Sequence, residues 1–545
     1  MKRYLCILLL GMSVTLWAQN DKLTLSGSIQ SDVLIPQNDS VIGAERDGDQ
    51  LKTNTYIDLL LQSKHVDAGV RVEYMDHPLP GFDSDFKGWG VPHAYVKGRM
   101  KNAELTLGTF YEQFGSGFIL RSYEERSLGI DNSLLGAHLQ LTPTEGLRLK
   151  ALYGKQRVYW SWADNYIGGV DAETDLNEWL PALRKSGTRL TLGASWVNKH
   201  EKAEDHKLTG LPYKLNLPEY VNAWDVRANL HHGNWNVLAE YAQISDNPSK
   251  DNDYIYRRGY VAMLSTSYST RGLSLLLQAK RSDNTSLRSQ RDRQGTAAML
   301  NHLPAFSLDH TYALAALYPY ATQQDGEWAY QGQVGYNFRK NTSLGGKYGT
   351  NLRLNYSLVK GLNKNPHTNP VTGTKEGSDG YGSAFWKWGD TYYQDLNIQM
   401  DKRLTHDFKL SLMYMNQHYN MSVVEGDGGM IRSDIYVAEG KYTINRKATL
   451  RGELQYLTTA EDEGDWMFGL LELSLLPHWM LTVSDQWNCG VSKIHYYQGL
   501  VTFNTGAHRI QAGYARIQAG NNCSGGVCRY VPAIKGFILS YNYNF

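Results

Sequence analysis

The chain ends in Phe537-Ile538-Leu539-Ser540-Tyr541-Asn542-Tyr543-Asn544-Phe545. Every odd-numbered position of this stretch is apolar or aromatic, whereas the even-numbered positions are Ser or Asn, with Ile538 the exception. Because successive side chains of a β-strand point to opposite faces, this period of two predicts a strand with one apolar and one polar face. The strand runs to the last residue and ends on aromatic side chains.

Working backward from this end, strands of about ten residues are joined alternately by tight turns and by longer polar loops. Residues 447–456 face 434–444 across Asn445-Arg446, and residues 408–417 face 393–404 across Thr405-His406-Asp407. Longer polar stretches, such as residues 420–430 and 520–533, lie between these hairpins. Short turns at one end and long loops at the other are typical of a transmembrane barrel.

The alternation also separates charged from apolar residues. In residues 447–456 the apolar side chains lie on one face (Leu450, Leu454, Tyr456) and the polar ones on the other (Arg451, Glu453, Gln455). This arrangement predicts a wet interior and a lipid-facing exterior, since a soluble barrel would be apolar inside. In hydrocarbon every backbone group must be paired internally, so the sheet must close. The expected fold is all-β: a single large antiparallel transmembrane β-barrel of about 24 strands, an even number between about 18 and 26.

The composition agrees with many strands. The 545 residues include 52 Gly, 14 Trp, 37 Tyr and 13 Phe but 15 Pro and 4 Cys, and Gly and aromatic excess of this kind favours β-structure. Fifty-five basic against 54 acidic residues give a net charge of +1, which excludes the basic surface expected of a nucleic-acid-binding protein. The mean hydropathy of −0.46 argues against helical membrane spans.

Both ends of the chain indicate export. Lys2 and Arg3 precede an apolar run, residues 4–16, and Ala18 precedes a plausible cleavage point, as in a secretory signal peptide. The terminal aromatic residues Tyr541, Tyr543 and Phe545 resemble the C-terminal signal of bacterial outer-membrane barrels. We therefore expect residues 1–18 to be a cleaved signal peptide and residues 19–545 a transmembrane β-barrel with long extracellular loops. The expected location is the outer membrane of a Gram-negative bacterium. The expected partners are outer-membrane lipid and the barrel-assembly machinery during biogenesis.

A barrel this wide is open unless something fills it. The candidate loops for filling the lumen are residues 75–92, 114–132, 160–188, 281–325 and 361–390. The second loop carries the densest cluster of opposite charges: Arg121, Glu124, Glu125, Arg126 and Asp131. Folded into the lumen, such a cluster forms either a constriction that selects polar solutes or a buried network that pins the loop to the wall. Both interpretations place the cluster inside the barrel.

Two loop features have alternative interpretations. Cys523 and Cys528 enclose four residues on the last long loop, and two Gly between them permit a disulfide in an oxidising compartment. A bridge to Cys489 is the alternative, and one thiol must remain over. Trp386 and Trp388 either grip a ligand or belong to the aromatic girdle at the membrane interface, which is the commoner role.

The loops also carry motifs that resemble a known family. The elements are Pro78-Leu79-Pro80-Gly81-Phe82 with residues 85–90, Phe114-Gly115-Ser116-Gly117 with residues 121–133, His310-Thr311-Tyr312 with residues 319–322, and residues 344–349. With the two ends, they resemble a family of outer-membrane β-barrel proteins of unknown function common in Bacteroidetes. The resemblance covers most of the mature chain and implies a barrel in the outer membrane, without implying any chemistry.

We therefore expect a channel or transport-associated pore for polar solutes. The alternative is a structural barrel subunit of a larger outer-membrane assembly, in which the loops are docking surfaces for an outer-membrane protein partner. No phosphate-binding Gly loop, zinc spacing, dinucleotide fingerprint or Ser-His pair stands out, so we expect no enzyme activity, cofactor or metal.

Overall fold

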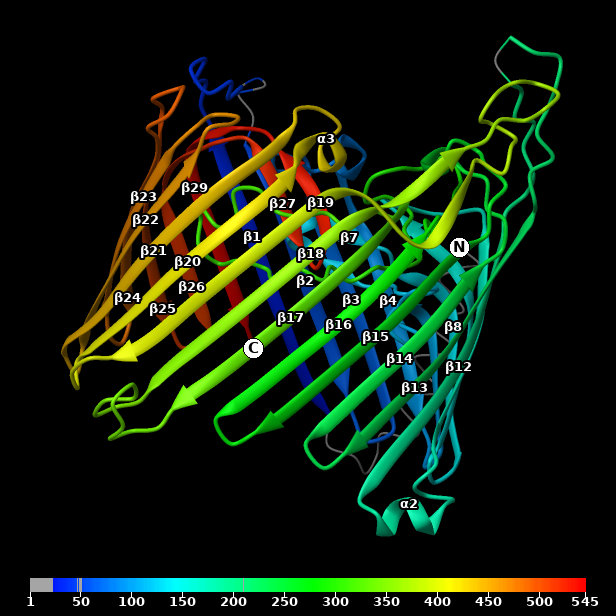
Figure 1. Cartoon of the computed structure of the whole chain (residues 1–545), viewed down its shortest axis with the longest axis horizontal. Helices are drawn as coiled ribbons and strands as arrows, with labels where there is room; N and C mark the ends of the chain where they lie inside the picture. Colours follow the sequence, from blue (N-terminus) through cyan, green and yellow to red (C-terminus); the bar gives the residue numbers. More distant parts are fainter. Residues whose placement is uncertain (1–22, 47, 49–50, 209) are drawn as a thin grey trace.

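The computed structural model describes residues 23–46, 48, 51–208 and 210–545. These residues form a closed antiparallel barrel of 24 strands (Figure 1), from which the two-residue strand β10 branches as a partner of β9. The ring closes where β1 pairs with both β2 and β29. At the closure the backbones of Gly27 and Phe545 exchange two hydrogen bonds of 2.9 and 3.0 Å. The expected fold class is confirmed.

The strands that form the barrel are β1 (Thr24–Pro36), β2 (Lys52–Gln62), β3 (Val66–Met75), β4 (Gly88–Arg99), β5 (Ala103–Phe110), β8 (Leu134–Thr144), β9 (Leu147–Val158), β11 (Tyr166–Asp175), β12 (Thr188–His200), β13 (Tyr220–His232), β14 (Trp235–Ile244), β15 (Gly259–Thr270), β16 (Leu273–Asp283), β17 (Gly326–Phe338), β18 (Thr350–Pro366), β19 (Tyr381–Arg403), β20 (Phe408–Asn420), β21 (Met430–Asn445), β22 (Ala448–Thr459), β23 (Trp466–Leu475), β24 (Trp479–Asn488), β25 (His495–Thr505), β26 (His508–Ile517) and β29 (Ile534–Asn544). The remaining elements are β6 (Glu124–Glu125), β7 (Ile130–Asp131), β10 (Ser161–Trp162), β27 (Gly520–Ser524), β28 (Val527–Val531), the helices α2 (Pro181–Lys185) and α3 (Met421–Val424), and the 3₁₀ turns η2 (Ser84–Phe86), η3 (Arg126–Leu128) and η4 (Lys250–Asn252).

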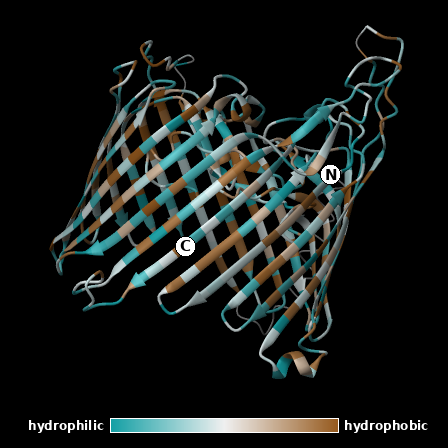
Figure 2. Cartoon of the chain, in the orientation of Figure 1, coloured by the Kyte–Doolittle hydropathy of each residue, from teal (hydrophilic) through white to brown (hydrophobic). Residues whose placement is uncertain are grey.

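The two faces of the barrel wall differ as the alternation predicts. Leu412 and Leu454 are 38% and 67% exposed on the outside, while their neighbours Ser411 and Gln455 are 4% and 3% exposed. Hydrophobic and hydrophilic residues alternate along the strands in Figure 2. The outer surface therefore presents apolar side chains to its surroundings, as a lipid-facing wall requires.

The connections at the two ends of the barrel differ in length. At one end, here called the short-turn end, most connections have two to four residues, as between β21 and β22 or β25 and β26. Two connections there are longer: residues 176–187, which contain α2 at the bottom of Figure 1, and residues 339–349. The opposite, long-loop end carries the connections that fold into the lumen.

Two of the loops expected in the lumen are not there. Residues 160–188 contain β11, a wall strand, and α2 at the short-turn end. Residues 361–390 continue β18 and β19 beyond the neighbouring strands as an extended hairpin. Strand-forming residues in both segments pair with the sheet, which leaves residues 176–187 and 367–380 as the connections. The predicted signal peptide, residues 1–18, lies outside the described residues. Among the residues that the structure describes, no helix is long and apolar enough to cross a membrane.

Candidate functional site

Two loops meet inside the barrel and form what we call the loop layer: residues 111–133, between β5 and β8, and residues 284–325, between β16 and β17. The first loop turns sharply at Gly115 and Gly117, where φ is +51° and +93°. This turn brings the side chains of Phe118 and Ile119, among others, into complete burial. Such burial requires that the loop pack against other parts of the chain and not extend into solvent.

The turn of the first loop docks on the wall through Glu240 of β14. The carboxylate of Glu240 accepts hydrogen bonds from the backbone N–H of Ser116 at 2.9 Å and from its hydroxyl at 2.5 Å. A Cβ at Gly115 would lie 2.5 Å from Glu240 Oε1. Glycine is therefore required here by close approach as well as by its positive φ.

Part of the predicted charge cluster pairs with charged residues of the wall. Arg126 lies 2.9 Å from Asp58 of β2 and 2.6 Å from Glu124. Arg71 of β3 lies 2.6 Å from Asp58 and 2.7 Å from Glu124. Two arginines and two carboxylates thus form a ring of four ion pairs between the loop and the wall.

Asp131, at the end of the same loop, belongs to a more deeply buried group. Arg157 of β9 lies 2.5 Å from Asp131 and 2.7 Å from Glu73 of β3. The side chains of Arg157 and Glu73 are each 2% exposed. Buried charges in hydrogen-bonded pairs of this kind fix the position of the loop, because breaking one pair leaves a buried charge without compensation.

The other two predicted residues are not in these networks. The guanidinium of Arg121 stacks on the ring of Tyr123, 4.3 Å from its centroid. Glu125 accepts hydrogen bonds from the backbone and hydroxyl of Ser127 and so caps the turn η3. The cluster of five predicted from sequence is thus divided: Glu124, Arg126 and Asp131 pair with the wall, and Arg121 and Glu125 do not. No pattern in the sequence marks the wall residues that pair with them.

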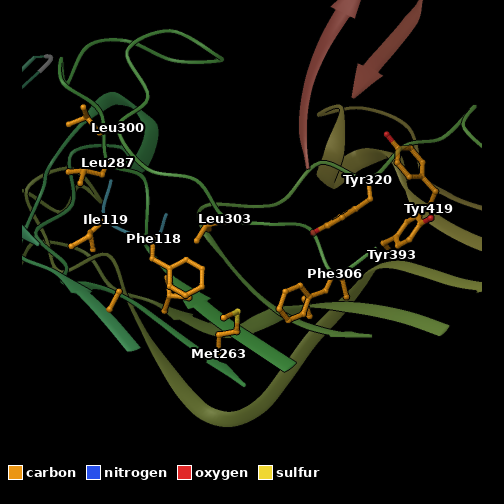
Figure 3. Packing of buried hydrophobic residues seen from close by; sticks show 14 of the residues in the cluster. Phe118, Ile119, Met263, Leu287, Leu300, Leu303, Phe306, Tyr320, Tyr393 and Tyr419 are labelled. Atoms are coloured by element: carbon orange, nitrogen blue, oxygen red, sulfur yellow. The ribbon is translucent and has the colours of Figure 1, made fainter. Parts of the chain in front are cut away.

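The second loop joins the first through backbone contacts. The N–H of Arg121 donates to the carbonyl of Leu300 at 2.7 Å, and the N–H of His302 donates to the carbonyl of Gly117 at 2.9 Å. Figure 3 shows the apolar side chains that gather around this junction, with Phe118 and Ile119 from the first loop and Leu300 and Leu303 from the second. The two loops therefore pack together as one body.

From this junction the second loop continues to the opposite wall. His310 lies 2.8 Å from Asp395 of β19, and the N–H of Leu314 donates to Gln455 of β22 at 2.8 Å. The amide of Gln417 on β20 donates to the carbonyl of Tyr318 at 3.0 Å. The loop layer thus spans the lumen from β14 to β22.

Beside these polar anchors, the wall around the layer also carries inward-facing apolar residues, which differs from the wet interior that the alternation predicts. Inward-facing apolar residues from many strands surround the layer, among them Val261, Met263, Met413, Met415, Ile435, Val437 and Leu457. The sequence of β20 indicates these apolar contacts, because its inward-facing residues are Ser411 nearer the short-turn end and Met413 and Met415 nearer the long-loop end. Inward charged residues nearer the short-turn end are more exposed, as in the pair Arg353–Asp401, whereas those at the level of the layer are buried in pairs such as Arg157–Glu73.

A hairpin of β27 and β28 covers the layer from the long-loop side. Cys523 and Cys528 form a disulfide across this hairpin, and Cys489 is free. The carbonyl of Gly526 accepts a hydrogen bond from the N–H of Thr322 at 2.9 Å. A cavity of about 480 Å³ lies between the hairpin, the first loop and β9, with Asp131, Arg157 and Arg529 among its lining residues.

His302, within the layer, is a buried imidazole without a charged partner. Its Nδ1 atom has no hydrogen-bond partner among the described residues, and the side chain stacks edge-on to Tyr123 at 6.1 Å between centroids. Burial, together with the positive charges of Arg121 and Lys280, lowers the pKa of His302 to about 3. The imidazole is therefore neutral at ordinary pH.

The site offers no arrangement typical of a metalloenzyme. Within the described ranges, no group of three or more His, Cys, Asp or Glu side chains is placed to hold a metal ion. The chemistry present is that of ion pairs and hydrogen bonds that position loops.

The closed ring, the apolar outer wall and the loops folded inward define a transmembrane β-barrel of the outer-membrane type. The chain belongs to the "Family of unknown function (DUF6029)", whose model matches residues 1–545. No curated protein matches the sequence.

Several solved structures are similar in fold. One is OccAB3 of Acinetobacter baumannii, with 10% identity, a TM-score of 0.37, and coverage of 96% of this chain and 99% of that one. Another is the translocation pore of the P pilus usher PapC, with 10% identity, a TM-score of 0.47 and coverage of 96% and 99%. A third is the siderophore receptor PirA of Pseudomonas aeruginosa, with 9% identity, a TM-score of 0.40 and coverage of 96% and 80%. These similarities concern the fold alone.

Proposed function

We propose that the protein is an outer-membrane, transport-associated barrel for polar solutes, in which the loop layer closes the lumen and must move for a solute to pass. The observation that carries this proposal is the change in the lumen along the barrel axis. Toward the short-turn end inward charged side chains are exposed to water, whereas toward the long-loop end the inward side chains are either apolar or buried in ion pairs and are covered by the layer. We place the protein in a Gram-negative bacterium, and propose an origin in Bacteroidetes.

The short-turn half of the lumen suits polar solutes. Arg353 lies 2.9 Å from Asp401 and Lys409 lies 3.1 Å from the same carboxylate. The side chains of Arg353 and Lys409 are 54% and 47% exposed, so water reaches them. Charged side chains of both signs along a water-filled wall set the selectivity of a pore.

The layer meets the wall through polar contacts at its two ends, and such contacts can be weakened one at a time. At one end Ser116 donates to Glu240, and at the other Leu314 and Tyr318 bond to amide side chains of the wall. A buried hydrogen bond contributes about 1 kcal/mol, and one to a charged group about 1.5–3 kcal/mol. Loosening such contacts shifts the population between closed and open states without unfolding the barrel.

The test is conductance in planar bilayers together with liposome swelling in arabinose. Wild-type protein is expected to open rarely. The double variant Ser116→Ala/Glu240→Gln weakens the docking of the first loop's turn on β14, while the ion pairs of Arg126 and Asp131 remain, and is expected to raise the open probability and admit the sugar. Arg353→Gln, far from the layer, is the matched control: it is expected to change ion selectivity during openings and leave their frequency unchanged.

One observation favours the alternative, a structural subunit. The layer is packed with fully buried side chains, including Phe114, Phe118 and Leu314, as in the core of a soluble protein. If the folded double variant admits neither ions nor arabinose, the layer is a permanent plug and the structural function is the better one. Co-purification of a stoichiometric protein in mild detergent is then the expected result.

A further inference from the structure

The extended β18–β19 hairpin bends over the outside of the barrel. The pairing of the two strands is interrupted by register shifts between Val359 and Leu362 and again before Lys364. Beyond these shifts the first residues of β19 lie against β17, where Trp328 Nε1 donates to the carbonyl of Phe385 at 3.1 Å. The ring of Trp386 stacks on that of Trp328 at 5.9 Å. We call residues 381–391 the outer flap.

The flap covers an arginine on the outer face of the wall. On β16, Lys280 faces the lumen, where its Nζ donates to Pro304 of the loop layer, so its neighbour Arg281 faces outward. Arg281 is fully buried all the same, because the rings of Tyr260 and Phe385 lie over its guanidinium, each at 4.9 Å. The guanidinium lies 3.4 Å from Asp283 and donates to the hydroxyl of Ser383 at 3.2 Å, while its Nε atom has no hydrogen-bond partner among the described residues.

Below the flap lies an apolar groove of about 600 Å³ on the outer wall, across β13 to β17. Its floor is formed by outward-facing alanines of neighbouring strands, including Ala228, which pairs with Ala239. Its sides are larger residues, including Leu264 and Trp386, which are 51% and 81% exposed. Arg281 lines its upper end. Small residues between large ones thus create a channel in a wall that is otherwise covered by bulky side chains.

We propose that this groove binds one acyl chain of a membrane lipid whose anionic, phosphate-bearing headgroup lies at the outer flap. The groove opens on the lipid-facing side, and its lining is almost entirely apolar, so a hydrocarbon chain fits it and a polar solute does not. An empty space of this size in hydrocarbon forfeits the contacts that an inserted chain restores.

The headgroup preference follows from the charges at the flap. Arg257 lies 3.0 Å from Asp283, which also accepts hydrogen bonds from the hydroxyls of Tyr381 and Ser383. This carboxylate is therefore already saturated. Arg258, next to Arg257 in the chain, and Lys387, in the flap, are exposed, and tryptophan rings of the kind found here anchor at the headgroup level of a bilayer. Basic side chains at that level attract anionic headgroups.

The flap distinguishes this site from ordinary annular lipid contact. On an open wall a lipid exchanges freely, whereas here Trp386 overhangs the chain and the aromatic cage around Arg281 closes the upper end of the groove. A lipid seated there leaves more slowly than its neighbours. Retention after extraction into detergent is the property that follows from this geometry.

The experiment is native mass spectrometry of the full-length barrel purified in mild detergent and then incubated with micelles doped with dimyristoyl-phosphatidylglycerol or dimyristoyl-phosphatidylcholine. Wild-type protein is expected to retain one phosphatidylglycerol more strongly than one phosphatidylcholine. Ala239→Phe fills the floor of the groove and is expected to reduce retention of both lipids about tenfold. Lys387→Glu is expected to leave retention of phosphatidylcholine unchanged and to abolish the preference for phosphatidylglycerol.

Ala438→Phe is the matched control, because Ala438 is also an exposed, outward-facing alanine but pairs with Leu412 and Leu454 on β21, seven strands from β14 around the ring. It is expected to retain lipid as the wild type does. Equal retention by wild type and Ala239→Phe, or equal loss in both Phe variants, would overturn the proposal. Folding of each variant is checked by heat-modifiable migration. The result is independent of the proposed transport function, since lipid retention does not require an open lumen.

Discussion

Replacing Arg157 by Met tests whether buried ion pairs hold the first loop in place. The substitution keeps an unbranched apolar stem but removes the guanidinium that lies 2.7 Å from Glu73 and 2.5 Å from Asp131. Breaking a buried pair in this way costs about 3–5 kcal/mol, because the remaining carboxylates stay buried. Arg71 still lies 3.8 Å from Glu73 and 3.6 Å from Asp131. Because this pairing remains, the expected loss in the free energy of unfolding is at the lower end of that range, about 3 kcal/mol.

The assay is urea unfolding of the barrel in lipid vesicles, followed by tryptophan fluorescence. A loss of about 3 kcal/mol changes the unfolding equilibrium about a hundredfold, which moves the midpoint clearly. Arg148→Met, on the same strand, is the control: its side chain is 53% exposed and 3.7 Å from Glu173, so it is expected to cost no more than about 1 kcal/mol. Adding Glu73→Gln to Arg157→Met is expected to recover part of the loss. Equal midpoints for wild type and Arg157→Met would refute the anchoring role.

Four further outcomes are expected. Leu454→Arg, at a 67% exposed outward position, is expected to cost about 2–4 kcal/mol in vesicles and less in detergent, which urea midpoints in the two media compare. Replacing Cys523 and Cys528 by Ser removes a small covalent loop and is expected to lower the stability of the hairpin by about 2 kcal/mol, seen as faster proteolysis at residues 520–531. Deleting Phe545 removes two backbone hydrogen bonds to Gly27 and is expected to reduce the amount of heat-modifiable barrel in outer-membrane fractions. Because the pKa of His302 is about 3 in the folded protein and about 6.5 when unfolded, stability is expected to fall as pH decreases from 6.5 toward 3, and His302→Gln is expected to flatten this dependence in urea midpoints.

The hairpins near the C-terminus could be predicted because the residues that determine each hairpin lie close together in the sequence. The turn at residues 446–447 and the turn at residues 404–407 lie within one residue of their expected positions. A two-residue period with polar and apolar faces specifies both the strand and its orientation, and no distant residue changes that result.

The partners of the charge cluster could not be predicted. Glu124 and Arg126 were recognised as charges that must be paired, yet Arg71 lies 53 residues before Glu124 in the chain. Two opposite charges that far apart in the chain form no periodic pattern, so the sequence does not show that they pair. The same limit applies to Glu240 and Ser116, which are 124 residues apart and meet only because the loop is folded into the lumen.

The apolar residues on the inner wall around the loop layer explain why the alternation of polar and apolar residues breaks down in some strands. A strand position is polar or apolar according to what covers that face, and the rule assumed water on the inner face along the whole strand. Where the loop layer covers the wall, residues such as Met413 and Met415 are buried on the inner face while Leu412 faces outward, so β20 has three apolar residues within a run of four. A continuous apolar run in a barrel strand therefore indicates that the lumen is filled at that level. Applied strand by strand to Val261, Val437 and Leu457, this criterion locates the layer toward the long-loop end from sequence alone, before any loop is traced.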